Sequence, residues 1–168
     1  MGGYIAFEIM RQAPQRVAKL ALLDTSARPE TPEQTQQRRP RIELARTGRF
    51  AEETDLQFPV LVHRDRHGDK ALRHLVRTMA EETGAEAFPR QMQAIIGRPD
   101  SRPVLAAIKC PTLILVGDGD ELTPPAQARE MADSIAGSRL LVIPDCGHLS
   151  TLERPQEVTQ ALAEWMTG

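Results

Sequence analysis

The 168-residue chain is poor in aromatic residues and cysteine, and it has no long apolar run. Aromatic residues make up only 4% of it, so its core must be built mainly from aliphatic side chains and Met. Two cysteines are too few for a disulfide framework, and no stretch approaches the roughly 20 apolar residues of a membrane-spanning helix. The formal net charge of −2 argues against a nucleic acid or a membrane surface as the main partner. The whole chain is 40% hydrophobic and 26% charged, which is the composition of an ordinary globular domain.

Three short apolar runs have the length and composition of buried β-strands. They are residues 17–24, 111–118 and 139–145. The middle run is apolar on both faces, as expected of a parallel strand covered by helices. Apolar residues recur at helical spacing after the second and third runs, at Ala128, Met131, Ala132 and Ile135 and at Val158, Ala161, Leu162 and Trp165. This alternation predicts an α/β fold with a parallel sheet flanked by helices.

The chain begins with a predicted helix that has an unusual start. Ile5, Ile9 and Met10 recur at helical spacing, whereas Gly2 and Gly3 stand where a capping Ser, Thr, Asp or Asn is usual. Glycines are poor residues for a helix start unless another part of the chain passes very close to the backbone. We therefore expect a close approach at these two glycines.

A long insertion, rich in Arg and Gln and without a strand pattern, separates the first two predicted strands. We expect four helices in it, over residues 32–45, 49–62, 69–82 and 85–96. The expected organisation is a helix and a core strand in residues 1–25, an all-helical lid in 26–108 and a C-terminal core in 109–168. The arginines are most simply a solvated helical surface.

Two histidines in the insertion have a spacing that can suit a metal ion on a helix. His63 and His67 are at i and i+4, with His74 further on. Gly68 and the charges around them favour a solvated loop between helices, so no metal site is expected.

Polar residues follow the second and third predicted strands, at the edge where ligands bind in open α/β sheets. Asp118 and Asp120 lie in VGDGDELTPP, and Asp118 is most simply a turn residue. His148 lies in PDCGHLSTLERP. Because neighbouring parallel strands end at the same edge, we expect an Nδ1–H···carboxylate bond between His148 and Asp120, which would orient the imidazole as a general base.

These loops resemble those of α/β-hydrolase-fold enzymes, in the branch of carboxylesterases, enol-lactonases and methyl esterases of pimeloyl carrier-protein esters. GDGDELTPP resembles the acid loop, with the acid at Asp120, and DCGHLSTLERP resembles the histidine loop, with the base at His148. The resemblance covers essentially the whole chain, and the insertion matches the lid in position. It implies Ser-His-Asp hydrolysis of an ester or similar acyl bond in a small molecule, without a cofactor.

In the same family, Met-Gly-Gly follows the nucleophilic serine of a Gly-x-Ser-Met-Gly-Gly elbow. The resemblance therefore places the serine immediately before Met1 and makes the Met1 backbone N–H one donor of the oxyanion hole. If the three strands lie side by side in sequence order, strand 17–24 also has an open edge, which points to a missing N-terminal half. Without the nucleophile, we expect the 168 residues alone to have no meaningful esterase activity.

Other interpretations stay open on the sequence alone. An Asp in place of the Ser would make a dehalogenase or an epoxide hydrolase. A second alternative is a non-catalytic remnant or binding module. A third is that the chain is one half of a pair and joins an N-terminal partner chain along residues 17–24. Cys146 and Ser150 flank His148, but neighbours at that spacing tend to point apart, so neither is favoured as a nucleophile.

The two cysteines are expected at opposite ends of neighbouring strands. Cys110 precedes the second strand and Cys146 follows the third, which separates them by roughly 20 Å. A disulfide needs Cα atoms within about 7 Å. We therefore predict two free thiols, as in a reducing compartment, and a cytoplasmic location.

Overall fold

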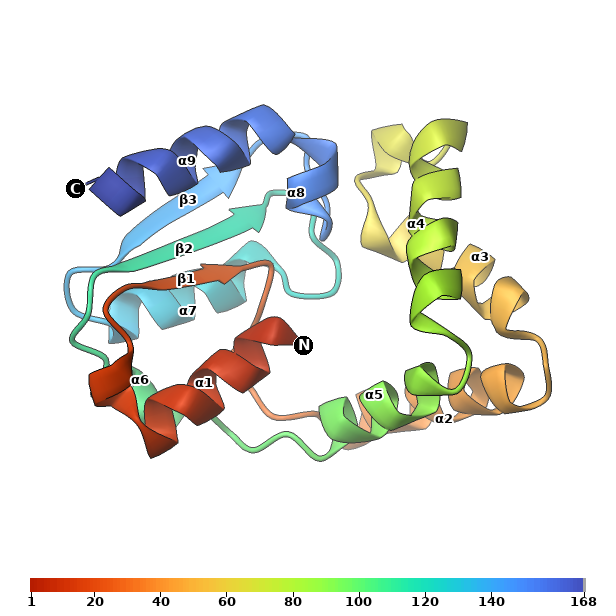
Figure 1. Cartoon of the computed structure of the whole chain (residues 1–168), viewed down its shortest axis with the longest axis horizontal. Coiled ribbons are helices and arrows are strands. Elements are labelled where there is room, and N and C mark those ends of the chain that lie inside the picture. Colours follow the sequence, from red (N-terminus) through yellow and green to blue (C-terminus); the bar gives the residue numbers. More distant parts are fainter. Residues whose placement is uncertain (168) are drawn as a thin grey trace. The chain divides into compact units, whose positions relative to one another are not determined.

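The computed structural model describes residues 1–167, which form two compact units (Figure 1). The core unit comprises residues 1–28, 60–64 and those from Asp100 onward, and it contains the sheet. The helical unit comprises residues 29–59 and 65–99. It is shorter at both ends than the predicted lid of 26–108, and residues 60–64 leave it to join the core unit.

The three predicted strands form one parallel sheet, in the order β1-β2-β3. They are β1 (Leu20–Leu23), β2 (Thr112–Gly117) and β3 (Arg139–Ile143). Leu20 pairs with Thr112, and Leu113 pairs with Arg139. All six residues of the central strand β2 are buried, which is why that run is apolar on both faces.

Helices cover both faces of the sheet (Figure 1). One core cluster joins β1 and β2 to α1 (Gly2–Gln12), α6 (Arg102–Leu105) and α7 (Pro125–Ser134). A second cluster joins the opposite face to α9 (Pro155–Thr167). The predicted stripes on α7 and α9 are confirmed, since their residues are buried or packed against these clusters. The remaining short elements of this unit are η1 (Pro14–Arg16) and α8 (Ser150–Glu153).

The side of α1 that packs against the sheet carries Phe7 and Met10. Phe7 and Met10 are buried, whereas Ile5 is 55% exposed and Ile9 is 45% exposed. Apolar residues lie on more than one side of this helix, so spacing alone does not decide which side meets the sheet. The packing against β1 and β2 selects Phe7 and Met10.

The close approach expected at the start of α1 occurs at one of its two glycines. A Cβ atom on Gly3 would lie 2.3 Å from Thr25 Oγ1, so a larger residue would force the two segments apart. At Gly2 such an atom would meet nothing within 4 Å.

The insertion contains the four predicted helices, with ends displaced by at most two residues. They are α2 (Pro32–Arg46), α3 (Phe50–Leu61), α4 (Lys70–Thr83) and α5 (Ala87–Ile96), with η2 (Arg64–Arg66) between α3 and α4. Thr31 and Gln34 form a capping box at the start of α2.

Some arginines of the helical unit are not on a solvated surface. Arg38 and Arg98 both bind the Glu30 carboxylate, whose side chain is 1% exposed. Arg41 donates to Glu53 at 2.7 Å, and Glu53 is buried as well. Guanidinium groups satisfy these buried carboxylates, which would otherwise be costly. Among residues 1–167, no helix is long and apolar enough to cross a membrane.

Candidate active site

The Asp120 carboxylate is fixed by its own turn after β2. Oδ1 accepts hydrogen bonds from the backbone N–H groups of Leu122 and Thr123, both at 2.9 Å. Oδ2 accepts one from the Thr123 hydroxyl at 2.7 Å. Asp120 is 2% exposed, so the side chain has little freedom to turn. The turn residue Asp118 is exposed instead, and its Oδ1 accepts from Cys146 N at 3.2 Å.

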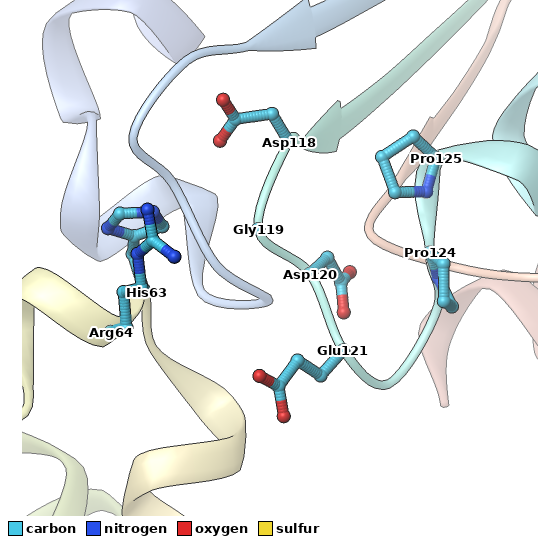
Figure 2. Close-up of a pocket in the computed structure, with 8 residues that line it drawn as sticks. All are labelled: His63, Arg64, Asp118, Gly119, Asp120, Glu121, Pro124 and Pro125. Carbon is cyan, nitrogen blue, oxygen red and sulfur yellow. The ribbon is translucent and has the colours of Figure 1, made fainter.

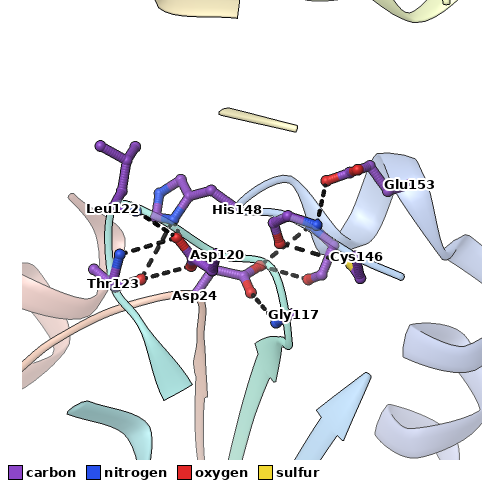
Figure 3. Close-up of polar contacts among 10 residues, drawn as sticks. Asp24, Gly117, Asp120, Leu122, Thr123, Cys146, His148 and Glu153 are labelled. Carbon is purple, nitrogen blue, oxygen red and sulfur yellow. Dashed lines mark hydrogen bonds and ion pairs between the residues drawn. The ribbon is translucent and has the colours of Figure 1, made fainter. Parts of the chain in front are cut away.

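His148 and Asp120 lie together, in the arrangement expected from the sequence (Figure 3). His148 Nδ1 is 2.9 Å from Asp120 Oδ2 and 3.3 Å from Thr123 Oγ1. The Thr123 hydroxyl donates to the carboxylate, so Nδ1 is best satisfied as an N–H that donates to Asp120. This assignment leaves Nε2 of the ring with a lone pair that can take up a proton.

The charge of Asp120 suits this pairing. Burial acts to raise the pKa of its carboxyl, but the hydrogen bond and charge of His148 and the hydrogen bonds from Thr123 outweigh burial and lower that pKa. Asp120 is therefore ionised at neutral pH, directly beside the imidazole that it orients.

A third carboxylate, Asp24, lies next to this pair and was missed by the sequence reasoning (Figure 3). Asp24 follows β1 with a positive φ of 46°. Its Oδ2 accepts from the Ser150 hydroxyl at 2.5 Å and from Ser150 N at 3.3 Å, and its Oδ1 accepts from Gly117 N at 3.4 Å. Burial raises the pKa of Asp24 to about 6, against the hydrogen bond from Ser150 and the charge of His148. The one sequence signal was its position, since it follows a strand.

A fourth carboxylate, Glu153 of α8, is buried behind the histidine loop. Its Oε1 accepts from Gly147 N at 2.9 Å, and its Oε2 accepts from His63 N at 2.8 Å. The prediction that His63 lies in a solvated loop is therefore wrong, because this residue is buried in the core unit. His67 and His74 are exposed.

A pocket of about 620 Å³ opens beside these loops within the core unit. Figure 2 shows His63 and Arg64 on one side of it and the acid loop on the other. The pocket is lined by His63, Arg64, Asp118, Gly119, Asp120, Glu121, Pro124 and Pro125. A small molecule in this pocket would lie beside the acid loop.

The alternative nucleophiles have unsuitable surroundings. Ser150 is fully buried, so its hydroxyl, which donates to Asp24, is closed to a substrate. Burial raises the pKa of the Cys146 thiol to about 12, and the charges of Glu153 and Asp24 add to this effect. A thiol with that pKa is not a nucleophile at neutral pH. Cys110 and Cys146 are both free thiols.

The predicted oxyanion donor, Met1, immediately precedes the first residue of α1. Its carbonyl accepts from Tyr4 N and Ile5 N, which closes the first helical turn. No distance in the structure tests the role of its N–H, so that role stays a prediction.

A parallel sheet whose strand ends carry a buried acid and a hydrogen-bonded histidine is the arrangement of α/β hydrolases. The family model described as alpha/beta hydrolase fold matches residues 1–155. The chain belongs to this family.

Relatives match along almost the whole chain. A thermophilic esterase from Thermogutta terrifontis is 38% identical with a TM-score of 0.87, over 99% of this chain and 61% of the esterase chain. The enol-lactonase from Burkholderia xenovorans LB400 is 30% identical with a TM-score of 0.88, over 100% of this chain and 63% of its own. A pimeloyl-[acyl-carrier protein] methyl ester esterase from Chromobacterium violaceum is 28% identical over 98% of this chain and 66% of its length. The chain thus spans less than two thirds of these relatives.

Proposed function

We propose that the chain supplies the acid and the base of a hydrolase that cleaves an ester or similar acyl bond in a small molecule. The observation that carries this proposal is the 2.9 Å contact between His148 Nδ1 and Asp120 Oδ2, made by a carboxylate that is itself held by Leu122 and Thr123. Esterases and an enol-lactonase among the relatives support the choice of reaction.

The proposed mechanism assigns one role to each group. The nucleophile is a serine ahead of Met1, and His148 Nε2 takes the proton of its hydroxyl as the oxygen attacks the carbonyl carbon. The Asp120 carboxylate stabilises the imidazolium that forms. The Met1 N–H donates to the tetrahedral oxyanion. His148 then protonates the departing alcohol, and a water molecule activated by the same imidazole releases the acid.

The first test of the proposal measures hydrolysis of a p-nitrophenyl ester by the protein as its native host makes it. His148→Ala should lower kcat by at least about 10³-fold, since the serine then has no base. The matched control is His74→Ala, which removes an exposed histidine of α4 and should leave the rate unchanged. Equal rates for the wild type and His148→Ala would contradict the proposal.

A second test locates the nucleophile. Labelling with a fluorophosphonate, followed by mass spectrometry, should place the modification on a residue ahead of Met1. The isolated 168 residues should neither be labelled nor turn over the ester. Turnover by these residues alone that disappears with His148→Ala would place the nucleophile within them and refute this part of the proposal.

A further inference from the structure

Glu153 joins two segments that are far apart in the sequence. It is 4% exposed, and its two carboxylate oxygens accept hydrogen bonds from Gly147 N and from His63 N. His63 lies 90 positions earlier in the chain than Glu153. Hydrogen bonds from backbone N–H groups to a buried carboxylate are short and strong because the acceptor is charged. Glu153 therefore holds residues 60–64 against the loop that carries His148.

Residues 60–64, which we call the brace, also contact both catalytic loops sterically. A Cβ atom on Gly147 would lie 2.5 Å from His63 N, so the brace and the histidine loop are in backbone-to-backbone contact. A Cβ atom on Gly119 of the acid loop would lie 2.4 Å from His63 Cδ2. Side chains at these two glycines would push the brace away.

The brace also binds the main chain of His148 itself. His148 N donates to Leu61 O at 3.0 Å. The backbone of the candidate base is thus held by Leu61, while its ring is held by Asp120 at 2.9 Å. Both ends of the residue are fixed by groups that come from other parts of the chain.

We propose that Glu153 is a positioning residue for His148, acting through the brace. By holding His63 and Gly147 together, it fixes the direction in which the His148 side chain leaves the main chain. A displacement of about 1 Å there would lengthen the contact between Nδ1 and Asp120 beyond a good hydrogen bond. The catalytic consequence rests on the proposed function, whereas the geometric consequence does not.

The first measurement is the tautomer of His148, from long-range ¹H–¹⁵N correlations on protein labelled at histidine. In the wild type we expect the Nδ1–H form to exceed the Nε2–H form by at least about tenfold. Glu153→Gln keeps the size but loses one of the two acceptors, and it should reduce that ratio by at least about fivefold. A folded Glu153→Gln protein with the wild-type ratio would overturn the proposal.

The matched control is Glu53→Gln in the helical unit, a buried glutamate that accepts from Arg41. It should lower the Tm as Glu153→Gln does, while leaving the His148 tautomer ratio unchanged. An equal change of the ratio in both variants would show a general loss of stability and refute the positioning role.

Amide hydrogen exchange on the wild type tests the brace without any substitution. The amides of His63, Gly147 and His148 should exchange within about threefold of one another, because one opening event releases all three. Exchange at His63 more than about tenfold faster than at His148 would show that the two segments open separately.

The kinetic readout separates this proposal from the proposed function. In the active protein, Glu153→Gln should lower kcat by about 10- to 100-fold and change KM by less than about twofold. If His148→Ala leaves the rate intact while Glu153→Gln still shifts the tautomer ratio, the proposed function fails and the positioning role stands. A kcat unchanged in Glu153→Gln, in a protein whose activity does require His148, would refute the catalytic consequence.

Discussion

Asp24→Asn should change how the free energy of unfolding depends on pH. Burial raises the pKa of Asp24 from its ordinary value of 3.8 to about 6. The folded protein therefore keeps a proton between about pH 4 and pH 6 that the unfolded chain has already lost. The contribution of Asp24 to the free energy of unfolding is therefore most favourable below about pH 4, where the carboxyl is protonated in both states, and this favourable part is lost as the pH rises through 6. Since each pKa unit corresponds to about 1.4 kcal/mol, the loss is about 3 kcal/mol by neutral pH.

Asparagine removes this cost because it carries no charge at any pH, and its amide oxygen can still accept from Ser150. Other carboxylates titrate in the same range, so the quantity to compare is the difference between wild type and variant. That difference should be near zero at pH 4 and should favour Asp24→Asn by about 3 kcal/mol at pH 7.5.

Urea unfolding at pH 4, 5, 6 and 7.5 measures this difference. Asp133→Asn, at an exposed position on α7, is the control and should follow the wild type at every pH. The reasoning would be refuted if the free energies of unfolding of the wild type and Asp24→Asn changed in parallel with pH. It would also be refuted if the wild type became more stable relative to the variant as the pH rises.

Further predictions concern the start of α1 and the thiols. Gly3→Ala should lower the free energy of unfolding by about 1–3 kcal/mol, because its Cβ would meet Thr25, whereas Gly2→Ala should not; urea melts of both variants check this. Thr25→Val should raise that free energy by about 1 kcal/mol in the same assay, since Oγ1 of Thr25 is the one buried side-chain polar atom without a hydrogen-bond partner in residues 1–167. Native thiol titration at pH 8 should modify half-buried Cys110 well before Cys146, and equal rates would contradict the raised pKa of the latter.

The parts of this molecule that the sequence predicts are those specified locally. Each strand, and each helix that packs on the sheet, carries its own apolar pattern, and Asp120 and His148 lie in the loops that follow β2 and β3. Parallel strands bring such positions to one edge, so their meeting needs no further information.

The parts that the sequence did not predict depend on long-range contacts. Asp24 accepts a hydrogen bond from Ser150, 126 positions later, and the local sequence LALLD does not indicate that partner. Residues 49–62 carry one continuous helical pattern, which gives no sign that the Leu61 carbonyl accepts a hydrogen bond from the histidine loop. For α1, apolar residues on several sides left the choice of buried face to its tertiary neighbours.

The course of the brace has a consequence for exchanging helical units between relatives in protein engineering. Residues 60–64 interrupt the helical unit, which therefore consists of two stretches, 29–59 and 65–99. Replacing 29–99 as a single cassette would also replace Leu61 and His63, whose backbone groups bind His148 and Glu153. A graft made as two inserts on either side of the retained pentapeptide would preserve those contacts. The continuous insertion that the sequence shows is therefore a poorer segment to transplant than the two separate stretches of the helical unit.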